Sequence, residues 1–119
     1  MSPVKVFNCE VCTLDDYLSE KHLDRIDFIK LDVEGAELPA LLGGLRTLQK
    51  FHPKIHVEFF REWTEAFGYT AKDLISCLQS LGYKHFYLDN FLLLHSPIEQ
   101  LETGVKSQNI ICSVTALNK

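Results

Sequence analysis

The sequence predicts an α/β fold with a mostly parallel sheet and an antiparallel carboxyl-terminal strand or hairpin. Short apolar runs alternate with segments in which leucines recur at helical spacing, an order typical of a parallel sheet. The run from Ile26 to Asp32 is apolar almost throughout, as in a parallel strand covered on both faces. The last strand-like runs follow one another closely, and this predicts the antiparallel finish.

Length and composition indicate a single domain. The chain has 119 residues, of which 46% are hydrophobic and 24% are charged, an ordinary globular balance. The net charge is −4 and the lysines and arginines are scattered, so we expect no nucleic-acid partner. Residues 1–12 lack the apolar core of a signal peptide and residues 86–94 are too few to span a bilayer, so we expect no membrane partner.

The four cysteines favour a cytoplasmic location. Cys9 and Cys12 have the spacing of half a zinc site, but the sequence has no second pair, and no thioredoxin-like pattern follows them. Cys77 and Cys112 each stand alone within an apolar pattern. We therefore expect buried, reduced thiols, which behave as small hydrophobic side chains, and no metal site.

The first elements are an extended segment around Val4 and Val6, a helix and a strand. Thr13 is the expected cap of the helix, whose apolar residues share one face and which ends near His22. The strand that ends at Asp32 follows directly.

A second helix is expected from about residue 36. Pro39 falls in its first turn, where the backbone N–H groups have no intrahelical partner and proline is tolerated. The pair Gly43-Gly44 interrupts the leucine-rich pattern and predicts a bend or a break at that point. His52-Pro53 ends the helical region.

A second strand is predicted over residues 54–60, with His56 and Glu58 on the face opposite its apolar side chains. A capping box at Thr70 predicts a helix that ends at Gly82. The remaining predictions are a loop with a helical turn over 61–68, antiparallel strands over 83–88 and 91–95 joined at Asp89-Asn90, a short helix over 97–101 and a strand over 109–116.

Asp32 and Glu58 are the candidate catalytic residues. In open α/β sheets ligands bind at the carboxyl ends of the strands, and Asp32 ends a buried strand. The alternative is that Asp32 only caps the following turn or helix. If the strands over 26–32 and 54–60 are parallel neighbours, the two carboxylates emerge side by side. Such a pair could hold a divalent cation, polarise a hydroxyl or raise one another's pKa.

The residues around this pair are less specific. Glu34 and Gly35 form a tight loop, in which the glycine allows a sharp turn or the close approach of a ligand. Glu37 is expected to stabilise the dipole of the following helix. His56 is expected to be a core histidine with its hydrogen bonds satisfied. The sequence contains no G-x-G-x-x-G, no P-loop and no G-x-S-x-G.

Four linked segments carry a resemblance to a known family. They are Thr13 to Leu18, Ile26 to Glu37, Leu41 to Gly44 and Pro53 to Glu58, with K-L-D-V-E-G-A-E at their centre. Together they closely resemble the FkbM-type methyltransferases. The resemblance implies an S-adenosylmethionine-dependent enzyme of Rossmann-like fold that O-methylates a small molecule or a sugar.

The resemblance also implies roles for particular residues. The loop after the family's fourth strand faces cofactor and acceptor, which makes Glu34 and Gly35 candidate cofactor-binding residues. Asp32 or Glu58 would act as the base or hold a cation near the acceptor hydroxyl, while methyl transfer depends mostly on positioning.

The resemblance is confined to the carboxyl-terminal half of the family's domain. The glycine-rich first strand-turn-helix and the acidic end of the second strand, which hold the cofactor, have no counterpart in the 119 residues. We therefore expect one partial domain over residues 1–119, with the family's fourth to seventh strands. Alone it should bind S-adenosylmethionine weakly or not at all and be inactive. Three origins would explain such a partial domain: a shortened version of a longer protein, a partial gene or a degenerate copy.

Without the family's first strand, the segment Phe28–Val33 is expected to be an exposed apolar edge that favours self-association. A non-catalytic remnant that serves as an interaction or assembly module is the main alternative to an enzyme. A receiver-like phospho-acceptor domain centred on Asp32 is a weaker one, because the sequence lacks the early acidic pair that such domains use for magnesium.

Overall fold

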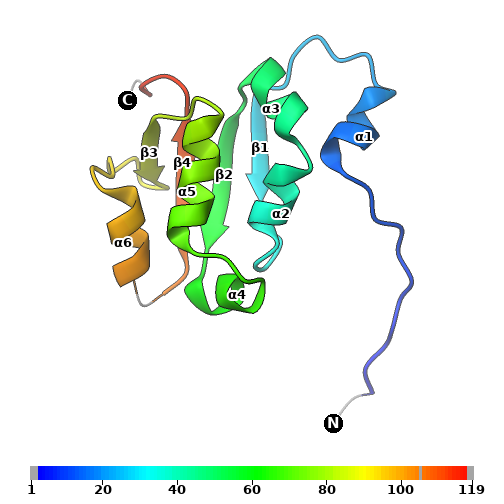
Figure 1. Cartoon of the computed structure of the whole chain (residues 1–119), viewed down its shortest axis with the longest axis horizontal. Helices are drawn as coiled ribbons and strands as arrows, with labels where there is room; N and C mark the ends of the chain where they lie inside the picture. The colour runs from blue at the N-terminus through cyan, green and yellow to red at the C-terminus, as the bar shows by residue number, and fades with distance from the viewer. Residues whose placement is uncertain (1–2, 105, 118–119) are drawn as a thin grey trace.

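The computed structural model describes residues 3–104 and 106–117, and it contains a mixed four-stranded sheet (Figure 1). In chain order the elements are α1 (Leu14–Ser19), β1 (Phe28–Leu31), α2 (Glu37–Leu42), α3 (Leu45–Phe51), β2 (Lys54–Phe59), α4 (Arg61–Ala66), α5 (Ala71–Ser80), β3 (His85–Leu88), α6 (Pro97–Thr103) and β4 (Gln108–Ser113).

The strand order across the sheet is β1-β2-β4-β3, so the last strand lies inside the sheet. β1 and β2 are parallel, whereas β4 runs antiparallel to both of its neighbours. β1, β2 and β3 therefore point the same way and only β4 is reversed, which agrees with the expected α/β class and antiparallel finish. Counted by strand pairs, however, one pair is parallel and two are antiparallel.

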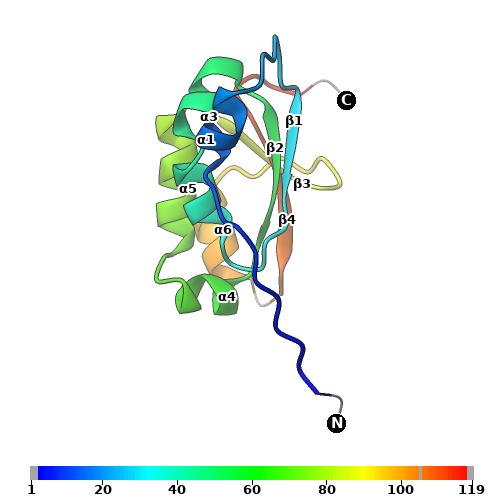
Figure 2. The same cartoon turned by 90° about the vertical axis from the view of Figure 1, so that its right-hand side faces the viewer.

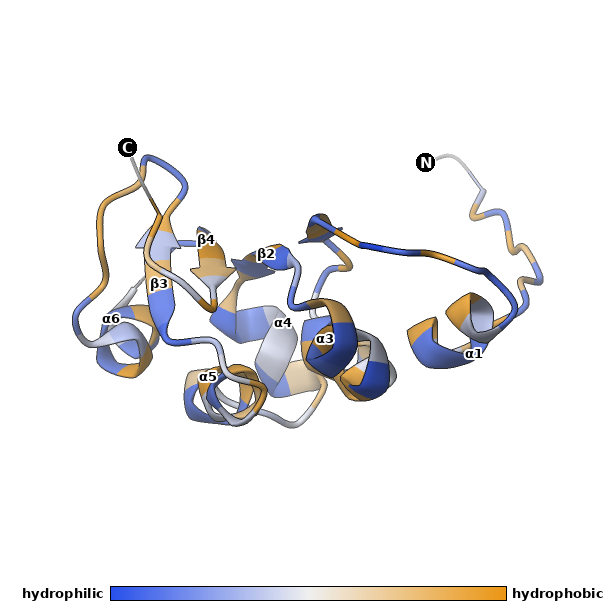
Figure 3. Ribbon diagram, turned by 90° about the horizontal axis from the view of Figure 1, so that it is seen from above, coloured by the Kyte–Doolittle hydropathy of each residue, from blue (hydrophilic) through white to orange (hydrophobic). Residues whose placement is uncertain are grey.

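The described helices lie on one face of the sheet, and the opposite face is left open (Figures 2 and 3). Side chains alternate between the two faces of a strand, so only every second residue reaches the helices. The buried core between helices and sheet is built on Ile55, Val57 and Phe59 of β2, Ile110 and Cys112 of β4, and the buried leucines of α2, α3 and α5.

This arrangement corrects the prediction that the strand before Asp32 is covered on both faces. β1 is the edge of the sheet, and its residues alternate between exposed and half-buried. Phe28 is 54% exposed and Lys30 is exposed, because both point to the open face. The expectation that this segment forms an apolar edge is met.

The glycine pair breaks the helical region as predicted, and it also allows helix α1 to pack closely. α2 ends at Leu42 and α3 begins at Leu45. A Cβ atom on Gly44 would lie 2.9 Å from the Leu14 side chain, and one on Gly43 would lie 3.2 Å from Thr13. Without these glycines, the start of α1 could not approach the α2–α3 junction so closely.

Other predictions are met in part. Thr13 and Thr70 both cap their helices, and Gly82 has a φ of +96° after α5. The chain does turn back after β3, but residues 91–95 form only one bridge, between Tyr87 and Leu93, and not a strand. Cys112 is buried as expected and Cys77 is half-buried, whereas Cys9 and Cys12 are exposed because the segment that carries them packs little against the core.

Candidate functional site

The loop between β1 and α2 holds a strained backbone conformation that its own sequence stabilises. Glu34 has a φ of 52° and Gly35 a φ of 106°, so both residues lie in the left-handed region. The carboxylate of Glu37 accepts hydrogen bonds from the backbone N–H of Val33 at 2.8 Å and of Gly35 at 3.0 Å. Glu37 is only 1% exposed. Its role is therefore to hold this loop, which is more specific than the dipole stabilisation expected from sequence.

Residues far along the chain secure the same loop from the other side. The hydroxyl of Tyr69 donates a hydrogen bond of 2.7 Å to the carbonyl of Gly35. A Cβ on Gly35 would lie 2.9 Å from the Phe67 ring and 3.0 Å from the Cβ of Trp63. Gly35 is thus required for packing, and both of its backbone polar groups are already bonded. Its predicted part in cofactor binding stays a prediction.

Asp32 and Glu58 meet at the carboxyl ends of the two parallel strands. Leu31 pairs with Val57 in the sheet, and the next residue of each strand is one of the two acids. The pKa of Glu58 is raised, first by partial burial, then by the negative charge of Asp32 and the hydrogen bond between the two carboxyl groups. The charges of Glu37 and Glu34 raise it further. The sequence-based expectation that these acids lie together is confirmed.

His56 lies two residues before Glu58 on β2 and on the same open face of the sheet. It pairs in register with Lys30 of β1 and Ile111 of β4. Its Nδ1 is buried and has no hydrogen-bond partner within residues 3–104 and 106–117. The expectation of a satisfied core histidine is therefore wrong, because the side chains at the neighbouring strand positions, Lys30 and Ile111, form no hydrogen bond with this nitrogen.

The site just described lies within a match to a known family. The model of the FkbM methyltransferase domain matches residues 2–85, which covers both acids and the loop between β1 and α2. This chain belongs to the FkbM methyltransferase family. Searches of curated proteins and of solved structures found no match.

Four acidic residues of this FkbM domain form two contrasting pairs, one bonded to the backbone and one not. Glu37 holds the loop, and Asp15 binds the start of α3, accepting hydrogen bonds from the N–H groups of Arg46 at 3.1 Å and Thr47 at 2.9 Å and from the Thr47 hydroxyl at 2.7 Å. Asp32, by contrast, caps no helix: the cap position of α2 is Ala36, without a side-chain bond. Across the described residues, neither Asp32 nor Glu58 bonds to a backbone group or pairs with a basic side chain.

Sequence reasoning missed Asp15 and Tyr69, because both act over long distances along the chain. Asp15 bonds to residues 31 and 32 positions away, and Tyr69 bonds to a carbonyl 34 positions away. The only local signal for Asp15 is that it follows a capping threonine, and that signal predicts a role in its own helix. Nothing near Tyr69 in the sequence indicates its partner.

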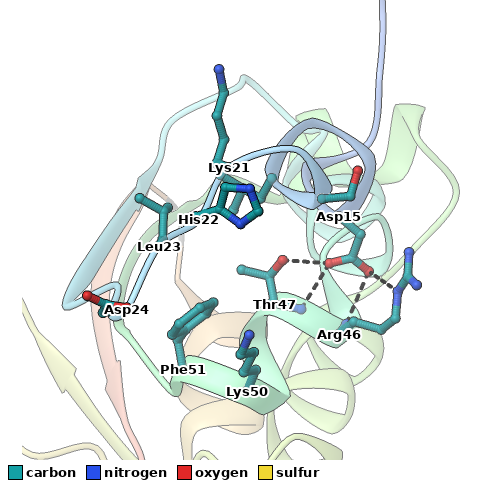
Figure 4. Close-up of a pocket in the computed structure, with 11 residues that line it drawn as sticks. Asp15, Lys21, His22, Leu23, Asp24, Arg46, Thr47, Lys50 and Phe51 are labelled. Carbon is teal, nitrogen blue, oxygen red and sulfur yellow. Dashed lines mark hydrogen bonds and ion pairs between the residues drawn. The ribbon is translucent and has the colours of Figure 1, made fainter.

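Two of the hollows in the described part of the FkbM domain adjoin β1. One, of about 460 Å³, is formed by α1, the loop before β1 and α3, and it contains Lys21, His22 and Lys50 (Figure 4). It adjoins the amino end of β1 and so lies away from the paired acids. The other is an apolar groove of about 670 Å³ beside β1, between α1 and α2.

In the part of the chain that the structure describes, no group of three His, Cys, Asp or Glu side chains is arranged to hold a metal ion. None of the helices there has the length and apolar character needed to cross a membrane.

Proposed function

We propose that this FkbM domain forms the acceptor-facing part of an S-adenosylmethionine-dependent O-methyltransferase that acts on a small molecule or sugar. The observation that supports it best is the pair Asp32 and Glu58. These acids stand together at the carboxyl ends of parallel strands, the Glu58 pKa is raised, and within the described residues neither binds a backbone group or a basic side chain. Carboxyl groups with perturbed pKa values of this kind are concentrated at functional sites.

The residues present fit one part of the cofactor. S-adenosylmethionine supplies an electrophilic methyl group on a positively charged sulfonium. The carboxylates of Asp32, Glu34 and Glu58 lie near one another at the carboxyl ends of β1 and β2, and their negative charge favours a cation there. For the adenosine part, the described residues beside β1 offer the apolar lining of the groove between α1 and α2, which Val33 and Ala36 bring up to the loop. Glu34 and Gly35 remain the candidate cofactor contacts, through the loop that they form.

The two acids would serve the acceptor. A hydroxyl placed beside Asp32 and Glu58 can donate its hydrogen bond to a carboxylate oxygen, which orients the oxygen lone pair for attack. The same carboxylate can then take the proton as the bond to the methyl group forms. Because its pKa is raised, Glu58 is a better proton acceptor than an ordinary glutamate. Glu37 and Tyr69 keep the loop rigid, so the geometry is set before the acceptor arrives.

The topology supports a Rossmann-like sheet of the methyltransferase kind. The order β1-β2-β4-β3, with only β4 reversed, is consistent with an assignment to the family's fourth, fifth, seventh and sixth strands. The proposal includes the partial character of the domain: β1 has a free edge where the cofactor-holding strands would adjoin it. This chain alone should then bind the cofactor weakly and transfer no methyl group.

Nuclear magnetic resonance of the ¹⁵N-labelled chain tests the proposal. Titration with S-adenosylmethionine should shift the amide signals of residues 33–36 and of Phe60, with weak affinity. Asp32→Asn should reduce these shifts, whereas Asp27→Asn, a matched change at the exposed opposite end of the same strand, should not. The amides of residues 21–24, at the far hollow, should stay unchanged.

Three outcomes would contradict the proposal. Absence of any shift at the loop would remove the cofactor-facing site and favour the non-catalytic module. Shifts confined to the far hollow would move the site elsewhere. Micromolar affinity measured by calorimetry would show that the domain holds the cofactor by itself and is not partial.

A further inference from the structure

Exposed apolar side chains gather on one side of the molecule. Of the thirteen large hydrophobic residues that are exposed in the described parts of the chain, nine lie before or around β1 and on the adjacent helices. They are Val4, Val6, Phe7, Val11, Tyr17, Leu23, Phe28, Val33 and Leu42. Scattered exposed apolar residues are normal, but so many in one part of the chain give it apolar surface that an assembly could cover.

The amino-terminal segment over residues 3–11, here called the arm, holds the most exposed of these residues. Val11 is 95% exposed and Val4 is 90% exposed. None of the backbone hydrogen bonds found in the described chain involves the arm. The arm extends away from the body of the protein (Figures 1 and 2). Its valines and phenylalanine favour a strand conformation, and nine residues of strand would span about 30 Å.

A complementary surface lies beside β1. Within residues 3–104 and 106–117, no strand pairs with the outer edge of β1, so its outward N–H and C=O groups are available. The apolar groove of about 670 Å³ runs along this edge, with Ile29, Leu31 and Leu41 among its lining. Val11 and Cys12 line its mouth, so the arm begins where the groove begins.

The arm is poorly placed to fill the groove of its own chain. α1 is fixed to the α2–α3 junction by the N–H of Asp15, which donates a 2.9 Å bond to the carbonyl of Gly43, and by the carboxylate of Asp15 on α3. From that anchor the arm runs away from β1 (Figure 1). A second copy of the chain brings the same arm toward the groove from outside.

We propose that two copies of this chain exchange their arms. The arm of each copy adds a strand to the free edge of β1 in the other, in the place where the cofactor-holding strands would adjoin it in a complete domain, and its apolar side chains enter the groove. The exchange is reciprocal and therefore closes as a twofold dimer. Because Asp32 directly follows β1, the added strand also supplies a wall beside the paired acids.

The test is the oligomeric state of the full chain in reducing buffer, which excludes disulfides through the exposed Cys9 and Cys12. Light scattering and sedimentation over a concentration series should show the monomer of 13.6 kDa converting to a dimer. The double variant Val6→Asp/Phe7→Asp should weaken dimerisation at least about tenfold. Because neighbouring side chains of a strand point to opposite faces, one of the two charges would enter the apolar groove in either register. Both residues are exposed in the monomer, so the variant should fold normally.

The matched control is Phe91→Asp/Leu92→Asp, which changes two exposed apolar residues in the turn after β3. It should leave the dimer unchanged. Hydrogen exchange should slow at residues 28–31 as the concentration rises. A wild-type chain that stays monomeric throughout, a dimer unaffected by the arm variant, or protection that appears on β4 in place of β1 would each overturn the proposal.

Discussion

At the scale of single residues, this domain uses its acids in two opposite ways. Glu37 and Asp15 are stabilised by the backbone N–H groups that they bind. Asp32 and Glu58 bring two negative charges together and, within the described residues, accept no bond from a backbone N–H, so they should reduce stability at neutral pH. The two kinds of carboxylate therefore have opposite pH dependence, and this can be measured.

Glu58→Gln should stabilise the protein at neutral pH. Burial and the charge of Asp32 raise the Glu58 pKa above its usual 4.5, so the folded state binds more protons than the unfolded state between these two pKa values. Stability from this group is present below pH 4.5 and is lost as pH rises through the folded pKa. The variant should therefore melt up to about 4 °C higher at pH 7 and show no gain at pH 4. Glu102→Gln, an exposed glutamate on α6, is the control; equal gains for both would contradict the pairing.

Asp15→Ala should destabilise the protein by about 1–2 kcal/mol at pH 7, because the first N–H groups of α3 lose their acceptor. Desolvation opposes ionisation, but the hydrogen bonds from Thr47 and Arg46 and the Arg46 charge leave the Asp15 pKa below its usual 3.8. This stabilisation is present above pH 3.8 and is lost as pH falls through the folded pKa. Thermal melts should show the deficit shrinking in acid. Asp16→Ala, at the neighbouring exposed position, should cost far less.

At the scale of elements, the loop between β1 and α2 is the part that depends most on tertiary packing. Gly35→Ala would place a methyl group against Phe67 and Trp63 in a backbone conformation that alanine rarely adopts. We expect a loss of at least about 2 kcal/mol, measured by chemical denaturation. Gly68→Ala, also at positive φ but with open space around the added carbon, should cost less. A similar loss at both glycines would show that backbone strain alone matters and that the aromatic clamp does not.

The same elements show what could be predicted from the sequence. Local signals worked where one residue acts on its own helix, as with the caps Thr13 and Thr70, or where alternation sets a face, as with His56 and Glu58. The adjacency of Asp32 and Glu58 followed from strand ends in a parallel pair. The predictions failed where the structure of a segment depends on what packs beside it. The sequence of an apolar strand does not show whether one of its faces is open, and the sequence of residues 91–95 does not show that only Leu93 pairs with β3.

At the scale of the whole molecule, the family match and the fold extend over different parts of the chain. The matched region ends at residue 85, where β3 begins, yet β4 lies in the centre of the sheet. The carboxyl-terminal region is therefore essential to the fold, although the family model does not cover it. Substitution of Ile110, which is fully buried on β4, by alanine should cost about 3–4 kcal/mol by chemical denaturation. Ile111→Ala, on the half-buried open face of the same strand, should cost less.

The central place of β4 also bears on the order of events during synthesis. When residues up to 107 have left the ribosome, β1 and β2 can pair, but the inner edge of β2 and the whole of β3 still await the last strand. Pairing between strands about 50 residues apart is slow, and unpaired strand edges attract other chains. The nascent chain thus passes through an interval in which its sheet is open on both sides, and holdase chaperones that shield such edges should raise the yield of folded protein.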